Sequence, residues 1–538
     1  MKMNKTIKHV STSDFKIPGG IHPHEFKQLS NKRNSEQLSP SSELTVVLSN
    51  SHDIQGELLV EKGQRISKGD LIVSTKDSQF GNNIHSPCDG EIMEINRLNL
   101  GHSSGLPIPG IRIKNNKNSS NEIESASNNY QAKWQDKTSE QLIERIHQAG
   151  IVGLGGAAFP THIKIKSGQS KVDTLIVNAM ECEPYITCDD RLIREKSLEI
   201  LIGSLITSKA VGAKKILLGI EDNKPEAVEA LSFSIQKLID DSQIVQRDNL
   251  PEIKIVVVDT KYPSGGEKQL IQLLTGKEVP QKKYPAELGI LVQNVATLYA
   301  IFNAVENATN LTERLVTITG DCVPQAGNYW IPFGTSVSHI INSLDIKIKE
   351  GDSIIFGGPL MGVSISTTNT PTQKSTNCII FDSNLKTVND FDSHHSACIR
   401  CGECEIACPV SLLPQQLYWF SQSEQWDELE SQSLFDCIEC GACSYVCPSE
   451  IPLVGYFRFA KSEIKHLNAK QVKSDKAKQR FENRENRLAR IKAEREEKRR
   501  KTAEARKFAA KNKAEDPDGK QRAIKAALER VKQKKENQ

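Results

Sequence analysis

Eight of the thirteen cysteines fall in two short runs that have the same spacing. The runs are Cys398-x2-Cys401-x2-Cys404-x3-Cys408 and Cys437-x2-Cys440-x2-Cys443-x3-Cys447, and a proline follows each of them. Thiols at two-residue gaps can place three sulfurs around one face of a small metal core, whereas a fourth sulfur must come from elsewhere in the chain. The two runs are therefore candidate metal-ligating loops that complete each other.

The spacing predicts two [4Fe–4S] clusters, because it is the pattern of bacterial ferredoxins, in which the fourth cysteine of each run ligates the other cluster. We expect one cluster on Cys398, Cys401, Cys404 and Cys447, and the other on Cys437, Cys440, Cys443 and Cys408. The alternative is a pair of zinc sites, but zinc ribbons use paired Cys-x2-Cys knuckles without a third cysteine or a Cys-Pro step. Clusters pass single electrons, so hydride chemistry in this chain would need a two-electron carrier such as a flavin.

Composition places these loops in a large globular chain. The 538 residues suggest several domains, and 37% hydrophobic with 25% charged residues is ordinary for a soluble protein. We expect no membrane span, because no apolar run approaches about 18 residues, and no secretory leader, because the first residues are polar. Clustered thiols then indicate metal ligands rather than disulfides. Residues 461–538 carry a net charge of +14 and the rest −11, which favours a tail that contacts an acidic surface or partner.

We predict a multidomain α/β and α+β chain. Short β-rich runs with turns at Gly63, Gly69 and Gly90 indicate a small β module, and apolar runs at 174–177, 215–218 and 253–258 are typical of buried strands in an α/β sheet. The predicted parts are an N-terminal lead-in at 1–30, a barrel-sandwich module like those of biotinyl and lipoyl carriers at 31–113, a linker at 114–135, an α/β core at 136–310, a β-grasp-like domain at 311–365, a linker at 366–390, a double [4Fe–4S] ferredoxin-like module at 391–460, and a basic helical or disordered tail at 461–538.

The α/β core begins with a glycine-rich loop that contains Gly153, Gly155 and Gly156. A helical pattern precedes the loop and Pro160 follows it, which is the wrong order for a Rossmann dinucleotide loop. The glycines would still let backbone N–H groups approach a phosphate or an isoalloxazine ring.

Four segments in order resemble the FMN-binding NADH dehydrogenase subunit of respiratory complex I. They are the glycine loop with its lysine, residues 178–184, residues 262–267 and residues 293–298. The resemblance implies an FMN held by Gly153, Gly155, Gly156, Lys164, Asn178, Glu181 and Asn294, with NAD(H) towards Phe159, Glu183, Glu267 and Tyr284. It implies no catalytic side chain, because the flavin supplies the hydride chemistry. The alternative is that the acids are surface charges and Lys164 an ordinary solvated lysine.

The chain departs from that family at four positions of these segments. Leu154 stands in place of an arginine, Met180 of an aspartate, Gly266 of a glutamate and Gln293 of an asparagine. Five further cysteines have no assigned role, and they are Cys88, Cys182, Cys188, Cys322 and Cys378.

Over roughly residues 10–460 the arrangement resembles the C subunit of the Rnf/Rsx ion-translocating electron transport complex, including the opening Gly19-Gly20-Ile21-His22-Pro23. This resemblance implies an oxidoreductase/translocase subunit, peripheral on the cytoplasmic side of the cell inner membrane. Its cofactors would be FMN and two [4Fe–4S] clusters, with NAD(H) as substrate. Its partners would be membrane subunits, a ferredoxin-like subunit and, indirectly, ferredoxin, whereas nucleic acid is not expected. Three alternatives stay open: a soluble corrinoid reductase, a cluster-only relay with a degenerate flavin pocket, and a redox-signalling role.

Overall fold

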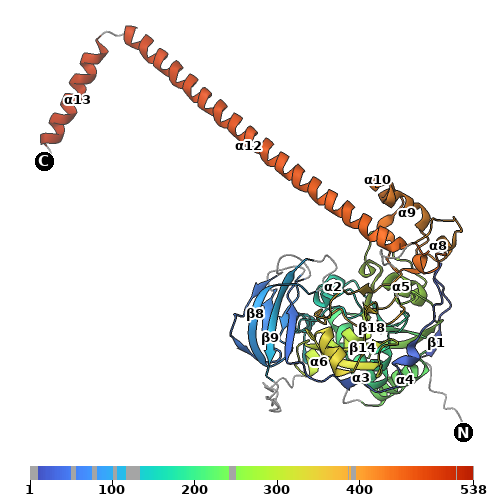
Figure 1. The fold of residues 1–538 in the computed structure, drawn as a ribbon. Coiled ribbons are helices and arrows are strands. Elements are labelled where there is room, and N and C mark those ends of the chain that lie inside the picture. The colour runs from blue at the N-terminus through green and yellow to red at the C-terminus, as the bar shows by residue number, and fades with distance from the viewer. Residues whose placement is uncertain are drawn as a thin grey trace. The chain divides into compact units, whose positions relative to one another are not determined.

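The computed structural model describes residues 10–49, 56–75, 81–100, 106–116, 134–241, 250–385, 387–388, 395–515 and 518–536. The chain divides into two compact units, Met1–Ala460 and Lys461–Gln538. The first unit contains three domains built on sheets and the cysteine-rich module (Figure 1). Most of the predicted linker at 114–135 lies outside the described residues.

The α/β core is a five-stranded parallel sheet in the order β1-β12-β11-β10-β13. Leu175 and Val177 of β10 face the core that holds α3, α4 and α6, whereas Ile176 faces α5. Burial on both faces is what a parallel sheet requires and what the apolar runs predicted. The elements are β1 (Val10–Thr12), β10 (Thr174–Ala179), β11 (Lys215–Glu221), β12 (Glu252–Val258), β13 (Ile290–Asn294), α1 (Ser139–Gln148), α2 (Thr161–Gly168), α3 (Cys188–Val211), α4 (Pro225–Asp240), α5 (Glu267–Thr275) and α6 (Val295–Glu306), with short 3-10 turns η2 (Trp134–Asp136) and η4 (Pro285–Leu288).

The strand order of this sheet reverses between β10 and β13. From β10 the chain moves outward through β11 and β12, and it then returns to place β13 on the other side of β10. Asn178 and Asn294 are direct partners in the pairing of these two strands, and both lie at the carboxyl ends. Open α/β sheets bind ligands at such a switch point, so the fold brings two of the predicted flavin residues to the expected place.

The domain that we predicted to be β-grasp-like contains a six-stranded mixed sheet in the order β17-β16-β18-β14-β15-β2, and this sheet extends beyond the predicted boundary. Residues 366–390, which we predicted to be a linker, include β18 (Cys378–Asp382) in the middle of this sheet. The Thr/Asn/Ser-rich flanks suggested a linker. The continuous apolar run at 378–381, however, is buried on both faces, as in a strand inside a sheet. The other elements are β2 (Glu36–Gln37), β14 (Glu313–Thr319), β15 (Gly327–Pro332), α7 (Val337–Ser343), β16 (Ser353–Phe356) and β17 (Val363–Ser364).

Two small antiparallel sheets form the barrel-sandwich module. One sheet has the order β3-β9-β8-β5 and the other β4-β6-β7, with a shared apolar core between them. The strands are β3 (Glu43–Val47), β4 (Glu57–Leu58), β5 (Arg65–Ile66), β6 (Leu71–Ser74), β7 (Ile84–His85), β8 (Gly90–Leu98) and β9 (Ile108–Asn115).

The residues before β3 belong to other domains. In the predicted lead-in at 1–30, β1 joins the parallel sheet of the core, and the 3-10 turn η1 (Lys27–Leu29) follows it. At 36–37, which we had placed in the barrel-sandwich module, β2 pairs with β15 of the β-grasp-like sheet. The opening segment therefore connects the three sheet domains, because its backbone groups find partners in each.

The cysteine module repeats one backbone conformation twice. Arg400 and Glu439, which precede the second cysteine of each run, have φ of 59° and 57°, and Gly402 and Gly441, which follow it, have φ of 84° and 79°. This left-handed geometry favours glycine, so it accounts for a glycine at the same position of each run. The elements are α8 (Glu403–Ile406), α9 (Pro414–Gln422), α10 (Trp426–Ser431), the 3-10 turn η5 (Leu434–Asp436) and α11 (Ala442–Tyr445).

The second unit is helical, which is one of the two forms predicted for the tail. Helix α12 (Leu453–Glu515) begins in the first unit and continues through the second, where α13 (Gly519–Glu536) follows. Ion pairs one helical turn apart, such as Glu497 with Lys501 at 2.8 Å, support a helix that has few apolar residues. Among the described residues, no helix combines the length and apolar character needed to cross a bilayer.

Candidate cofactor sites

The structure gathers the eight clustered cysteines into two sets of four, each around a small cavity, and the sets are those expected from the spacing. We call them site 1 and site 2. Site 1 is lined by Cys398, Cys401, Cys404 and Cys447. Site 2 is lined by Cys437, Cys440, Cys443 and Cys408. Each loop thus contributes its last cysteine to the other site. Each site then has the four cysteines that a [4Fe–4S] cluster needs.

The thiols of site 2 lie in an environment that disfavours a free thiolate. Burial raises the pKa of Cys440 to about 12 and the pKa of Cys443 well above its ordinary value. A thiolate at these positions therefore requires a positive charge close by, which bound iron would supply. The donor chemistry and its fourfold arrangement fit an iron–sulfur cluster at both sites.

The glycine loop forms a tight hairpin between α1 and α2, not a strand-to-helix turn. The N–H of Gly153 donates to the carbonyl of Phe159 at 2.8 Å, and the N–H of Ala158 donates back to the carbonyl of Gly153 at 3.1 Å. At the tip, Gly156 has a φ of +125°, and no atom lies within 4 Å of the position that a Cβ would occupy. Because the tip carries no side chain, its backbone is open to a ligand. The loop is therefore not a Rossmann turn, as predicted from the helical pattern before it.

Side chains from the other three segments gather near this loop. A Cβ on Gly155 would lie 3.4 Å from the Cβ of Asn294, so the loop packs on the carboxyl end of β13. Next to Asn294, the Gln293 Nε2 is buried and has no hydrogen-bond partner in the described residues. A buried amide donor without a partner is the kind of group that a ligand oxygen would satisfy.

Two further contacts connect the predicted flavin residues to the segment at 262–267. The Asn178 Nδ2 donates to the carbonyl of Gly265 at 2.9 Å, and the Lys164 Nζ forms an ion pair with Glu267 at 2.6 Å. The residues from all four segments therefore line one region at the carboxyl edge of the sheet. Their glycine backbone, amides and lysine fit an FMN phosphate and ring.

Two of the departures from the complex I family fill core positions. Leu154 is 2% exposed and Met180 is 5% exposed, and each belongs to one of the two hydrophobic cores of the α/β domain. These positions contribute packing rather than a charged contact. Gly266 takes an extended conformation at the position before α5.

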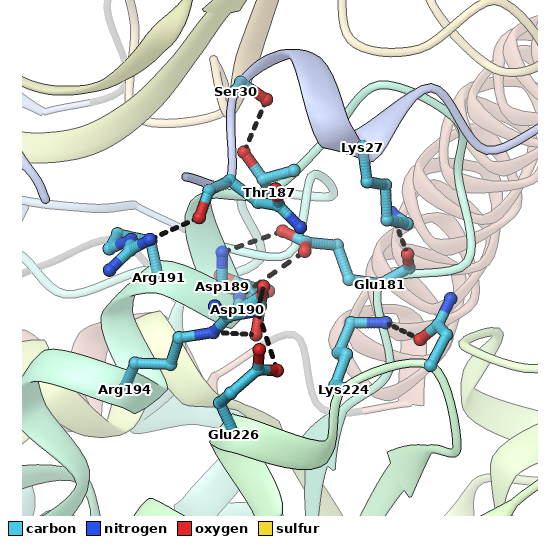
Figure 2. A network of polar contacts seen from close by, with 12 residues as sticks. Lys27, Ser30, Glu181, Thr187, Asp189, Asp190, Arg191, Arg194, Lys224 and Glu226 are labelled. Carbon is cyan, nitrogen blue, oxygen red and sulfur yellow. Dashed lines mark hydrogen bonds and ion pairs between the residues drawn. The ribbon is translucent and has the colours of Figure 1, made fainter. Parts of the chain in front are cut away.

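Glu181 lies inside the protein, within a network of buried charges (Figure 2). Its Oε1 accepts a hydrogen bond from the N–H of Asp189 at 2.7 Å, at the start of α3, and its carbonyl accepts one from the Lys27 Nζ at 2.5 Å. Burial raises the pKa of Glu181 to about 7. Asp189 in turn accepts from the Asn294 Nδ2 at 2.6 Å. Glu181 therefore reaches the predicted flavin residues through Asp189, and a direct flavin contact stays a prediction.

A buried ion pair that was not predicted from the sequence adjoins this network. Glu221 is 0% exposed and Lys224 is 1% exposed, and the Lys224 Nζ donates to the Glu221 Oε2. Burial alone would lower the pKa of Lys224, but the adjacent carboxylate of Glu221 raises it. Glu221 also accepts from the N–H of Glu181 at 3.1 Å. No spacing rule marks such a pair, because it depends on which charges the fold encloses.

The four residues predicted to lie towards NAD(H) divide into two kinds. Phe159 is 43% exposed, Tyr284 is 76% exposed, and Glu267 is also exposed. Glu183 instead turns towards the β-grasp-like domain, where its Oε1 accepts from the N–H of Leu360 at 2.7 Å. Burial raises the pKa of Glu183, and these backbone N–H groups oppose the rise. The first three are available to a ligand, whereas Glu183 is engaged within the protein.

The remaining five cysteines behave as ordinary thiols. Cys88, Cys188 and Cys378 are buried in the hydrophobic cores. The Cys182 Sγ accepts from the N–H of Gly265 at 3.4 Å, and burial raises its pKa to about 12. Burial and the carboxylate of Asp321 likewise raise the pKa of Cys322 to about 12. None of them carries the low pKa of a reactive thiolate.

Three family descriptions match consecutive parts of the chain. Residues 15–118 match the RnfC barrel sandwich hybrid domain, residues 146–303 match the Nuo51 FMN-binding domain, and residues 397–451 match the 4Fe-4S dicluster domain. These matches agree with the barrel-sandwich, flavin and cluster parts predicted from the sequence.

Among solved structures, the chain is similar to NAD+-reducing [NiFe]-hydrogenase in the H2-reduced state, with a TM-score of 0.45 and 17% identity over 61% of each chain. Among curated proteins, it is 42% identical to the C subunit of the ion-translocating oxidoreductase complex of Haemophilus influenzae strain PittEE, over 98% of this chain and 77% of the relative. The corresponding protein of Citrobacter koseri is 40% identical over 96% of this chain and 69% of the relative. The chain spans 61% of the length of the protein from Haemophilus influenzae strain Rd. It belongs to the family formed by the C subunits of ion-translocating oxidoreductase complexes.

Proposed function

We propose that this chain exchanges electrons between NAD(H) and two [4Fe–4S] clusters, with FMN bound in the α/β core, as a peripheral subunit on the cytoplasmic side of the cell inner membrane. The observation that carries the proposal is the pairing of two complete four-cysteine sites with a glycine loop at the switch point of a parallel sheet, in one compact unit. The relatives named as subunits of an ion-translocating oxidoreductase support the same function.

The residues proposed to bind FMN and NAD(H) would have the following roles. Bound FMN supplies the exchange between two-electron hydride chemistry and single-electron steps. The open backbone at Gly156 and the amides of Asn178 and Asn294 would hold and orient it, while Lys164 would offset the charge of its phosphate. Lys164 must then give up part of its ion pair with Glu267. Because the two side chains are 30% and 41% exposed, weakening this ion pair costs little free energy. Phe159 and Tyr284, which are exposed, would contact the dinucleotide.

The partners belong to the same proposal. Electrons would leave the clusters for membrane subunits, for a ferredoxin-like subunit and, through these, for ferredoxin. The second unit carries a net charge of +14, which favours contact with an acidic partner or an anionic membrane surface. A soluble corrinoid reductase is the second candidate, and the basic tail is the feature that argues against it.

The first experiment is anaerobic reconstitution followed by iron, sulfide and FMN analysis and by reduction with NADH. We expect two clusters and one FMN per chain, and rapid bleaching of the visible spectrum. The variant Lys164→Ala tests the flavin assignment, and Lys166→Ala, two residues later on α2, is its matched control because Lys166 is not among the proposed ligands. Only the first variant should lose FMN. Two clusters without FMN or bleaching would leave a cluster-only relay and would refute the flavin site.

A second experiment separates the membrane complex from the soluble reductase. The full-length chain, expressed with a tag in its native host, is recovered from the membrane and soluble fractions. Co-purification with membrane subunits supports the proposal. Recovery in the soluble fraction alone, with corrinoid reduction in place of NADH-linked electron transfer to the complex, would favour the alternative.

A further inference from the structure

The α/β core and the cysteine module meet at site 2. Tyr262, which is 2% exposed, donates a hydrogen bond from its hydroxyl to the carbonyl of Cys440 at 2.5 Å. Cys440 lines site 2, so the flavin-like domain contacts the backbone of a proposed cluster ligand directly.

Apolar packing closes the junction around this hydrogen bond. The buried residues Ile21, Tyr262, Leu360, Ala407, Cys440 and Ala442 form one hydrophobic cluster there. The opening segment contributes backbone contacts to this junction. The N–H of Gly20 donates to the carbonyl of Ala407 at 2.9 Å, and Ile21 forms an antiparallel β-bridge with Tyr262. The junction therefore excludes water beside site 2 and holds Tyr262 in one position.

Tyr262 also starts the segment that reaches the proposed flavin residues. Three positions further on, the carbonyl of Gly265 accepts from Asn178, and five positions further on, Glu267 pairs with Lys164. A single short segment thus spans from the ligand backbone of site 2 to the amide and lysine proposed to hold FMN.

Site 1 has no comparable contact with the α/β core among the described residues. Its Cys401 is exposed, and the neighbouring Ile399 and Ile406 are 67% and 71% exposed.

We propose that Tyr262 is a positioning residue for site 2, and that its hydrogen bond to the backbone of Cys440 helps to set the potential of the cluster held there. This inference rests on the proposed function. The Tyr262 hydroxyl dipole points its positive end at the backbone of Cys440, so it stabilises the extra negative charge of a reduced cluster in site 2.

The variant Tyr262→Phe tests this with a potentiometric titration followed by electron paramagnetic resonance, using chemical reductant and mediators rather than NADH. We expect the midpoint potential of site 2 to become more negative, that of site 1 to stay unchanged, and the iron content to equal that of the parent. The spectra are assigned with Cys401→Ser, which removes the cluster of site 1. Tyr418→Phe is the matched control, because Tyr418 lines site 1 and should move only the potential of site 1.

A kinetic readout accompanies the titration. In rapid mixing with NADH, Tyr262→Phe should slow reduction of the clusters several-fold while flavin reduction and the KM for NADH stay unchanged. If NADH reduces neither the parent nor the variant, the proposed function fails, but the chemical titration still tests Tyr262. An unchanged potential of site 2, or equal shifts at both sites, would overturn the inference.

A second variant covers the case in which Tyr262→Phe does not fold. Ile21→Ala trims the same junction without leaving a buried carbonyl unpaired, and it should admit water beside site 2. Water solvates the reduced cluster better, so the potential of site 2 should become less negative while that of site 1 is unchanged. A shift confined to site 1 would contradict the inference that this junction controls site 2.

Discussion

Replacing Lys224 with methionine should destabilise the α/β core severely. The change leaves Glu221, which is fully buried, without its only positively charged partner among the ion pairs of the described residues. Taking a carboxylate out of water costs several kcal/mol, and a buried charge whose partner is removed typically costs about 3–5 kcal/mol. For a domain of this size each kcal/mol lowers the unfolding midpoint by about 2–4 °C. We therefore expect Lys224→Met to lower the midpoint by roughly 6–20 °C.

Two controls make the result interpretable. Lys215→Met removes an ion pair to Glu252 on the adjacent strand of the same sheet, but both side chains are about half exposed, so the midpoint should hardly change. The double variant Lys224→Met with Glu221→Gln leaves no unpaired charge, so it should lose less stability than Lys224→Met alone.

The assay is thermal unfolding of the reconstituted protein, followed by tryptophan fluorescence. It is repeated with iron and flavin content measured before heating, so that lost cofactor is not mistaken for lost stability. A loss for Lys224→Met no larger than that for Lys215→Met would refute the reasoning, because it would mean that Glu221 is solvated or neutral in the folded protein.

Three further predictions concern other parts of the structure. Because burial raises the pKa of Glu181 to about 7, its contribution to stability is complete below its ordinary pKa and is lost as the pH rises to about 7. The free energy of unfolding, measured with urea across this range, should therefore fall by about 3 kcal/mol more in the parent than in Glu181→Gln, in which the other buried carboxyl groups still titrate. In Cys401→Ser, site 1 should lose its cluster, so iron analysis should find about half of the parent's iron and resonance spectra only the signal of site 2. Gly203→Ala would place a methyl group on the backbone carbonyl of Leu298, where α3 crosses α6, and urea unfolding should show a loss of about 1–3 kcal/mol.

The cysteine sites could be predicted almost completely from the sequence. Ligand spacing is a local property, and the exchange of the fourth cysteine follows from the repeat, so both sets agree with the residues around the two cavities. The glycine loop was also placed correctly after a helix, because the helical pattern before it and Pro160 after it are local signals.

Other features depend on contacts that no local pattern contains. The apolar run of β18 lies between polar flanks, and its central place in the sheet depends on its partners β14 and β16. The enclosure of Glu181 and Glu183 is equally non-local, because the groups that engage them lie in α3 and in the loop at 357–362. A carboxylate in a motif is predicted to face a ligand, but which way it turns is decided by the packing around it.

The opening segment has a consequence for synthesis of the protein. Val10 pairs with Ile255, Glu36 pairs with Tyr329, and Gly20 bonds to Ala407, so the whole segment cannot find its partners until the ribosome has made the far end of the first unit. Because domains fold as they emerge, the contact of Gly20 with Ala407 must be among the last of these to form. The junction beside site 2 can therefore close only after the cysteine module has been made, although the opening segment that closes it is made first.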